Sequence, residues 1–168
     1  MVPDFIKQLD DIVEIVGIDQ AFCARREDGR IACWGHRGYG GILPPEYEFE
    51  KFVQVTGTAV AFAGLKADGT VVTWGDAERG GDSSAVKERL VDIRAVYANS
   101  QAFAAIPAGG GVVTWGIAKG GGTPTPDQMA VLNDYLRYDT PGSVVSPSSP
   151  QGRALAIFRA KNLASIVA

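Results

Sequence analysis

Few side chains in this sequence could do chemistry, and most of them lie near its start. His36 is the only histidine, and Cys23 and Cys33 are the only cysteines among 168 residues. Zinc sites use several Cys and His ligands at characteristic spacings, and this set is too small to make a convincing one. A histidine-based triad would also need partners that the pattern does not indicate. We expect no metal and no cofactor, with His36 in an exposed loop.

Two further patterns occur in enzymes, but here they lack the context that enzymes require. The glycine runs 109–111 and 120–122 do not have the Gly-x-x-x-x-Gly-Lys-Ser/Thr spacing of a phosphate-binding loop. Carboxylates such as Asp76 and Glu78 lie near each other, yet nothing places them across a cleft. We expect turn glycines, no catalytic residue and a protein that is not an enzyme.

The elements that position these residues are repeated. Segments 21–35 (AFCARREDGRIACWG), 61–75 (AFAGLKADGTVVTWG) and 102–116 (AFAAIPAGGGVVTWG) align without gaps, and each ends in Trp-Gly. A fourth copy, 154–168, has Val167 and Ala168 where Trp-Gly is expected. The recurring tryptophans, Trp34, Trp74 and Trp115, are predicted to form the structural core of the repeat. Each tryptophan is followed by a glycine pair: Gly40 and Gly41, Gly80 and Gly81, and Gly120 and Gly121.

Within each copy the composition favours strands and tight turns. β-Branched and aromatic residues dominate the runs on either side of Asp28-Gly29 and Asp68-Gly69, which is a strong hairpin signal. Gly110-Gly111 is predicted to fill the same place in the third copy. Each copy is preceded by an extended stretch, at 12–16, 52–55 and 93–97.

Short helices are predicted between the copies. The clearest is 126–137, where a capping-box pattern precedes apolar residues at helical spacing. The stretch 139–153 is rich in Pro and Ser and is typical of an irregular surface insertion. Shorter helical turns are expected at 4–9, 46–52 and 84–90, with inward-facing Phe5, Leu9, Val86 and Leu90.

The two cysteines occupy positions where the other copies have small residues. If the hairpin loop is the segment 27–29, Cys23 and Cys33 lie directly opposite each other on neighbouring strands. That arrangement permits a disulfide. The simpler interpretation is two small buried side chains, since the other copies have Ala63 with Thr73 and Ala104 with Thr114.

The repeated phrase, with its Ala-aromatic-Ala start, Asp-Gly turn and Trp-Gly end, resembles the repeat of the regulator of chromosome condensation (RCC1) family. Segment 61–81 is the best match, 21–41 and 102–121 are good, and 154–168 is weak. The resemblance implies an all-β fold of RCC1-like β-propeller blades with short helices between them. The chain departs from the family in its shorter repeat, in a glycine loop without Gly-Gln-Leu-Gly, and in having at most four copies.

The repeats predict a single domain over 1–168, divided at about 1–41, 42–81, 82–122 and a degenerate 123–168. A blade cannot bury its sheet alone, and an unpaired edge promotes association. Closure by dimerisation, a four-blade ring and a capped open stack all solve this problem, and we favour a homo-oligomer. A β-trefoil or β-prism of three similar units is the alternative fold.

The loops after each Trp-Gly vary between copies, so they are the expected partner-binding surface. Tyr and Arg are frequent anchors of protein interfaces. The RCC1 resemblance implies a protein partner, because family members act as exchange factors, inhibitors or bacterial effectors. The alternatives are a carbohydrate-binding lectin with aromatic sites and a self-assembling scaffold. The candidate residues are His36, Arg37, Tyr39, Asp76, Glu78, Arg79 and Lys119.

The charge and the apolar runs of the chain argue against nucleic-acid-binding and membrane-spanning proteins. A net charge of −3 and a pI near 5.1 argue against nucleic-acid binding, and the apolar runs are too short to span a membrane. The segment 1–13 does not have the pattern of a signal peptide. We expect a cytoplasmic protein, or one exported without a cleavable signal. The 21 glycines among 168 residues indicate many turns.

Overall fold

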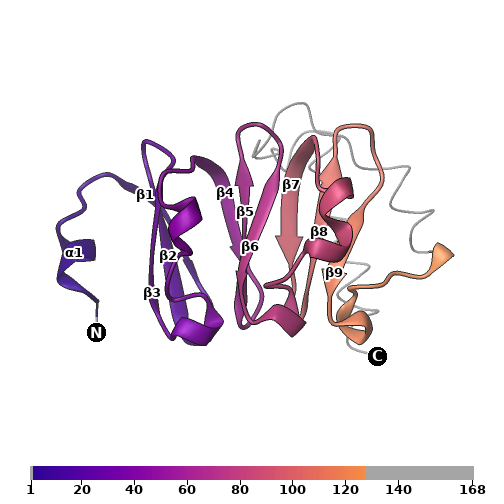
Figure 1. Ribbon diagram of the computed structural model, residues 1–168, viewed down its shortest axis with the longest axis horizontal. Coiled ribbons are helices and arrows are strands. Elements are labelled where there is room, and N and C mark those ends of the chain that lie inside the picture. The colour runs from indigo at the N-terminus through magenta and orange to yellow at the C-terminus, as the bar shows by residue number, and fades with distance from the viewer. Residues whose placement is uncertain (1, 128–168) are drawn as a thin grey trace, which may run out of the picture.

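In the computed structural model, which describes residues 2–127, the chain forms three antiparallel sheets of three strands each (Figure 1). Within each sheet the strands pair in sequence order, and we name the sheets blades 1, 2 and 3. Blade 1 contains β1 (Ile12–Gly17), β2 (Ala21–Arg26) and β3 (Ile31–Gly35). Blade 2 contains β4 (Phe52–Gly57), β5 (Ala61–Lys66) and β6 (Val71–Gly75). Blade 3 contains β7 (Ile93–Ala98), β8 (Ala102–Pro107) and β9 (Val113–Gly116).

These sheets confirm the predicted all-β blade architecture. Three separate sheets follow one another along the molecule, so the trefoil and prism alternatives are wrong. The fourth repeat (123–168) and the helix 126–137 lie almost wholly outside the described residues, and the insertion 139–153 lies entirely outside them.

The hairpins explain why the three copies align so well. In each, a short loop places the predicted pairs opposite each other, so that Cys23 faces Cys33 across the strands. The third residue of each turn is a glycine with a φ between 82° and 88°, where L side chains are strained. In the third copy this glycine is Gly110, so Gly109-Gly110 is the equivalent of Asp28-Gly29, one position earlier than predicted, and Gly111 of the predicted pair is also left-handed at φ 83°. The turn glycines of the first two copies are Gly29 and Gly69.

The short helices between blades differ in detail from the prediction. Helix α1 covers Asp4–Lys7, and the 3₁₀ helix η4 covers Ser84–Arg89. The predicted helix 46–52 is wrong: η2 covers Pro45–Tyr47, and Phe52 already belongs to β4. In α1 the buried residue is Ile6, whereas Phe5 is 55% exposed, which corrects the predicted inward orientation.

The core lies between the blades. Alternate side chains of a strand point to opposite faces, and each blade uses one face for small residues and the other for aromatic ones. Ala21, Cys23 and Cys33 of blade 1 pack against Phe62 and Trp74 of blade 2. The same contact is repeated between blades 2 and 3, with Ala61, Ala63 and Leu65 on one side and Val96, Phe103 and Trp115 on the other.

Candidate partner-binding edge

Each Trp-Gly is followed by a short 3₁₀ helix, and the three helices lie along one edge of the blades, the lower edge in Figure 1. They are η1 (Arg37–Tyr39), η3 (Ala77–Arg79) and η5 (Ala118–Gly120). Each ends at a left-handed glycine: Gly40 at φ 90°, Gly80 at 101° and Gly121 at 100°. A glycine in this conformation is a common helix end, so the three loops share one backbone path.

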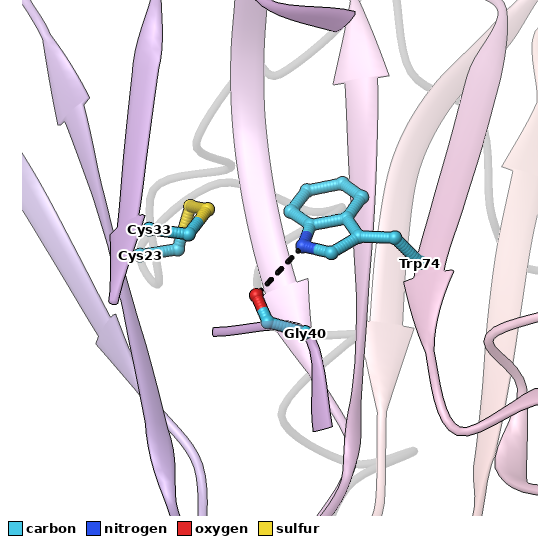
Figure 2. Close-up of a disulfide and its surroundings, with 4 residues drawn as sticks. All are labelled: Cys23, Cys33, Gly40 and Trp74. Atoms are coloured by element: carbon cyan, nitrogen blue, oxygen red, sulfur yellow. Dashed lines mark hydrogen bonds between the residues drawn. A yellow bond between two sulfur atoms is a disulfide. The ribbon is translucent and has the colours of Figure 1, made fainter. Parts of the chain in front are cut away.

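The tryptophan of the following blade holds the end of the first two loops. The indole Nε1 of Trp74 donates to the Gly40 carbonyl at 3.2 Å (Figure 2), and that of Trp115 donates to the Gly80 carbonyl at 3.1 Å. Both tryptophans are buried, at 4% and 5% exposure. The loops are therefore variable segments on a fixed scaffold, which is a common arrangement for binding sites.

The predicted contact residues lie on these loops, most of them in water. His36, Arg37, Glu78, Arg79 and Lys119 are exposed, while Tyr39 and Asp76 are half-buried. The His36 ring packs on the Tyr39 ring at a centroid distance of 4.6 Å. The loops of blades 1, 2 and 3 thus each present at least one exposed cationic side chain.

These cations are available to a partner. Within residues 2–127, the ion pairs involve other side chains, and none includes Arg37, Arg79 or Lys119. A cation that already had a carboxylate partner would lose that contact on binding. The three loop cations do not carry that cost.

Asp76 has a structural task that the sequence did not reveal. Its Oδ1 accepts a hydrogen bond from the Arg79 backbone N–H at 3.0 Å and caps η3. His36 and Ile117, which begin the other two loops, make no side-chain cap. Asp76 therefore serves to shape its loop, and a partner contact would compete with that bond.

Sequence reasoning also missed two tethers. The Thr58 Oγ1 donates to the Arg79 carbonyl at 3.2 Å, and the Asn99 Nδ2 donates to the Gly120 carbonyl at 2.6 Å. In the sequence, the only indication of these two tethers was a turn-forming polar residue three positions before the start of β5 and of β8. Ile18 holds the equivalent place in blade 1 and has no polar side-chain group, so that loop lacks a tether.

The two cysteines form a disulfide between β2 and β3 (Figure 2). Both are buried, at 1% and 8% exposure, on the face of blade 1 that packs against blade 2. The expectation of two small buried side chains was therefore incomplete. Among residues 2–127, no group of three or more His, Cys, Asp or Glu side chains could hold a metal ion.

In the described part of the chain, no helix has the length and apolar character needed to cross a membrane.

Stacked three-stranded blades with a loop held by the next tryptophan define a repeat protein of the β-propeller class. No protein-family model and no curated protein matches the chain. Among solved structures it is similar to Prp20p of Saccharomyces cerevisiae, the yeast RCC1, with a TM-score of 0.52 and 18% identity over 66% of this chain and 32% of Prp20p.

Two further solved structures are similar. Human WBSCR16 gives a TM-score of 0.52 at 18% identity, over 65% of this chain and 34% of its own. The ACR4 receptor kinase ectodomain of Arabidopsis thaliana gives 0.50 at 18%, over 70% and 41%. The chain thus spans about a third to two-fifths of these proteins. Identity at this level shows the fold alone, which is that of RCC1-like propeller blades.

Proposed function

We propose that this protein is a non-enzymatic module that binds a protein partner through the loops after each Trp-Gly. The observation that carries the proposal is the row of three fixed loops, each exposing a cation that has no ion pair within residues 2–127. Prp20p is described with its binding properties to Gsp1p and histones, and in a complex with Kap60. A protein partner is therefore the class that the fold favours.

The chemistry of the loops favours an acidic surface on that partner. Arg37 and Arg79 can pair with two carboxylate oxygens at once, whereas Lys119 offers a point charge. The Tyr39 and His36 rings supply apolar area beside Arg37. Charges at the rim of an interface mainly accelerate association, and packed aromatic groups slow dissociation.

The test is a capture of partners from a cognate lysate, followed by titration of the purified partner. The triple variant Arg37→Ala, Arg79→Ala, Lys119→Ala should weaken binding at least tenfold, and wild-type affinity should fall with added salt. The matched control is Lys51→Ala with Lys87→Ala, two exposed cations away from the three loops. Unchanged binding by the folded triple variant would refute the loop assignment.

The lectin alternative requires an accessible aromatic ring in every repeat. Trp74 and Trp115 are 4% and 5% exposed and hydrogen-bonded to a neighbouring blade. They cannot stack on a sugar without opening the blade junction, so we do not propose carbohydrate binding.

A further inference from the structure

The outer face of blade 1, which points away from blade 2, carries residue types that are buried in the other two blades. Ile15 is 58% exposed and Phe22 is 44% exposed. Their counterparts in blade 2, Val55 and Phe62, are 4% and 0% exposed and pack against blade 1. The counterparts in blade 3 are both 1% exposed: Val96 and Phe103. Blade 1 therefore has a junction surface that no blade within residues 2–127 covers.

The uncovered side chains lie together. The strand register places Ile15 opposite Ala24, and Phe22 opposite Trp34. Phe22 and Ala24 are two positions apart on β2, so their side chains share one face. The Trp34 ring stacks on the Phe22 ring at a centroid distance of 5.4 Å and an interplanar angle of 15°. These residues form one apolar surface on the sheet.

Helix α1 extends this surface, because it lies on the same side of blade 1 (Figure 1). Its Ile6 is 5% exposed, so the helix packs onto the fold, whereas its Phe5 is 55% exposed. We call the four exposed or half-buried apolar residues the blade 1 patch: Phe5, Ile15, Phe22 and Trp34. Apolar patches of this kind mark interaction sites on soluble proteins.

The area of the blade 1 patch matches what a dimer requires. A buried aromatic side chain covers about 150 to 250 Å², so the fractions exposed here leave about 400 Å² of the patch in water. Two copies of the patch would bury about 800 Å², and homodimer interfaces are about 65% apolar. The whole contact would then bury about 1,200 Å², which is the lower limit of specific protein interfaces.

The ion pairs that border the patch add no net charge to it. Arg26, on the same face of β2 as Phe22, pairs with Asp11 at 2.9 Å. Lys7 of α1 pairs with Asp4 at the same distance. A face with charge of one sign would repel its own copy. The patch differs in this respect from the loop edge, whose exposed cations favour a partner of opposite charge.

In the described part of the chain, blade 3 is already buried on its side away from blade 2. Ala102 and Ile106 alternate with Phe103 and Ala105, which pack towards blade 2, and they are 4% and 2% exposed. The uncovered sheet face of the described array is thus that of blade 1. A second copy can cover it with its own blade 1.

We infer that the outer face of blade 1 binds the same face of a second copy of this chain, in a dimer with twofold symmetry. In such an isologous contact both copies use the same patch, and the assembly closes at two chains. Phe22 and Trp34 of each copy become buried against the patch of the other copy. The loops after each Trp-Gly lie along a different edge and remain open to the proposed protein partner.

Sedimentation of the 168-residue chain from about 1 to 100 µM tests the dimer. At the upper end the wild type should approach twice the 17.7 kDa mass of one chain and not exceed it. Ile15→Lys with Phe22→Lys places like charges in both patches and should sediment as one chain throughout. The control is Phe49→Lys, on the connection between blades 1 and 2, which is 78% exposed and should behave as wild type.

A charge-reversed variant, Ile15→Asp with Phe22→Asp, distinguishes a face-to-face contact from other dimers. Alone it should also sediment as one chain. An equimolar mixture of the Lys and Asp variants should dimerise, because lysines of one copy then meet aspartates of the other, and added salt should weaken this dimer. Dimerisation of the mixture also shows that both variants are folded.

Hydrogen exchange of the wild type requires no substitution. The amides of Phe22 and Trp34 should exchange more slowly as the protein is concentrated over the same range, whereas those of β8 should not change. Equal exchange at both concentrations would count against the contact.

Four sedimentation results would overturn the inference. One is a wild-type protein that remains a single chain at every concentration, and another is a mass above two chains, which an isologous contact does not produce. The third is a wild-type mass for the Lys variant, because the dimer would then use another surface. The last is a mixture that remains at one chain although circular dichroism shows both variants to be folded.

Discussion

Blades 1 and 2 have the same strand lengths and the same strand register, yet they are stabilised differently. Blade 2 is covered on both faces, and its Trp74 donates a hydrogen bond to blade 1. Blade 1 is covered on one face only, so the stacked Phe22 and Trp34 remain in contact with water. A shared repeat sequence therefore does not give each copy the same stability.

The polar contacts of blade 2 reach the next blade, whereas the ion pair and the disulfide of blade 1 stay within its own sheet. In blade 2 the Gln54 amide bonds to the backbone N–H and carbonyl of Val96 in the next blade, at 2.9 and 2.7 Å. In blade 1 the equivalent Glu14 pairs with Arg25 of its own sheet at 2.8 Å, and the disulfide also lies within the sheet. Blade 1 depends more on contacts inside itself, which suits a blade with one neighbour.

The largest expected effect comes from removing a covered tryptophan. Trp74→Ala should lower the free energy of unfolding by about 3 to 5 kcal/mol, the usual range for a large buried aromatic residue. It also leaves the Gly40 carbonyl without its indole donor. Trp34→Ala should lower it by no more than about 1.5 kcal/mol, because half of that side chain already contacts water. Urea titration of both variants measures the difference.

The urea titrations belong at low protein concentration, where a second copy contributes nothing. Equal losses for the two variants would contradict the difference between the blades. A Trp34→Ala loss that grows as the protein is concentrated would instead agree with self-association through blade 1.

A second comparison replaces Cys23 and Cys33 of blade 1 with the residue types of the equivalent pair in blade 2, Ala63 and Thr73. The disulfide joins residues 10 apart, and closing a loop of this size is worth about 3 kcal/mol. In blade 2 the Thr73 Oγ1 donates to the Gly81 carbonyl at 3.1 Å. Cys23→Ala with Cys33→Thr offers the same bond to Gly41, so we expect a net loss of about 2 kcal/mol.

The matched control is Cys23→Ala with Cys33→Ala, which removes the disulfide without adding a hydroxyl and should lose about 3 kcal/mol. Urea unfolding of the wild type with and without a reductant gives the loss due to the disulfide alone. Two reactive thiols in the unfolded, unreduced wild type would show that the bond is absent.

The sequence predicted strands and hairpins because their signals are local. Asp-Gly turns, β-branched runs and the spacing of the tryptophans are set by nearby residues, and they placed Cys23 opposite Cys33 correctly. The helix expected at 46–52 was wrong, because proline at the first position of η2 starts that helix earlier and Phe52 is used by β4.

Features that depend on a neighbouring blade were not predictable from one copy. Phe22 and Phe62 stand in nearly the same local sequence, but only Phe62 has a blade in front of it. The short helices after Trp-Gly have too few residues to produce a periodic pattern. The Thr58 tether joins residues 21 positions apart, a contact that only the folded blade brings about.

The smallest expected effect concerns that tether and the loop it holds. The Thr58 Oγ1 accepts from the Ala61 N–H at 3.0 Å and donates to the Arg79 carbonyl. Thr58→Val leaves these buried groups unpaired and should cost about 1 to 2 kcal/mol, with faster hydrogen exchange in η3. Thr58→Ser should restore protection, whereas Ile18→Val in blade 1 should leave η1 unchanged because no hydroxyl is lost. If Thr58→Val left exchange in η3 unaltered, the Trp115 bond to Gly80 would suffice to hold the loop, and the tethered and untethered loops would be equally fixed.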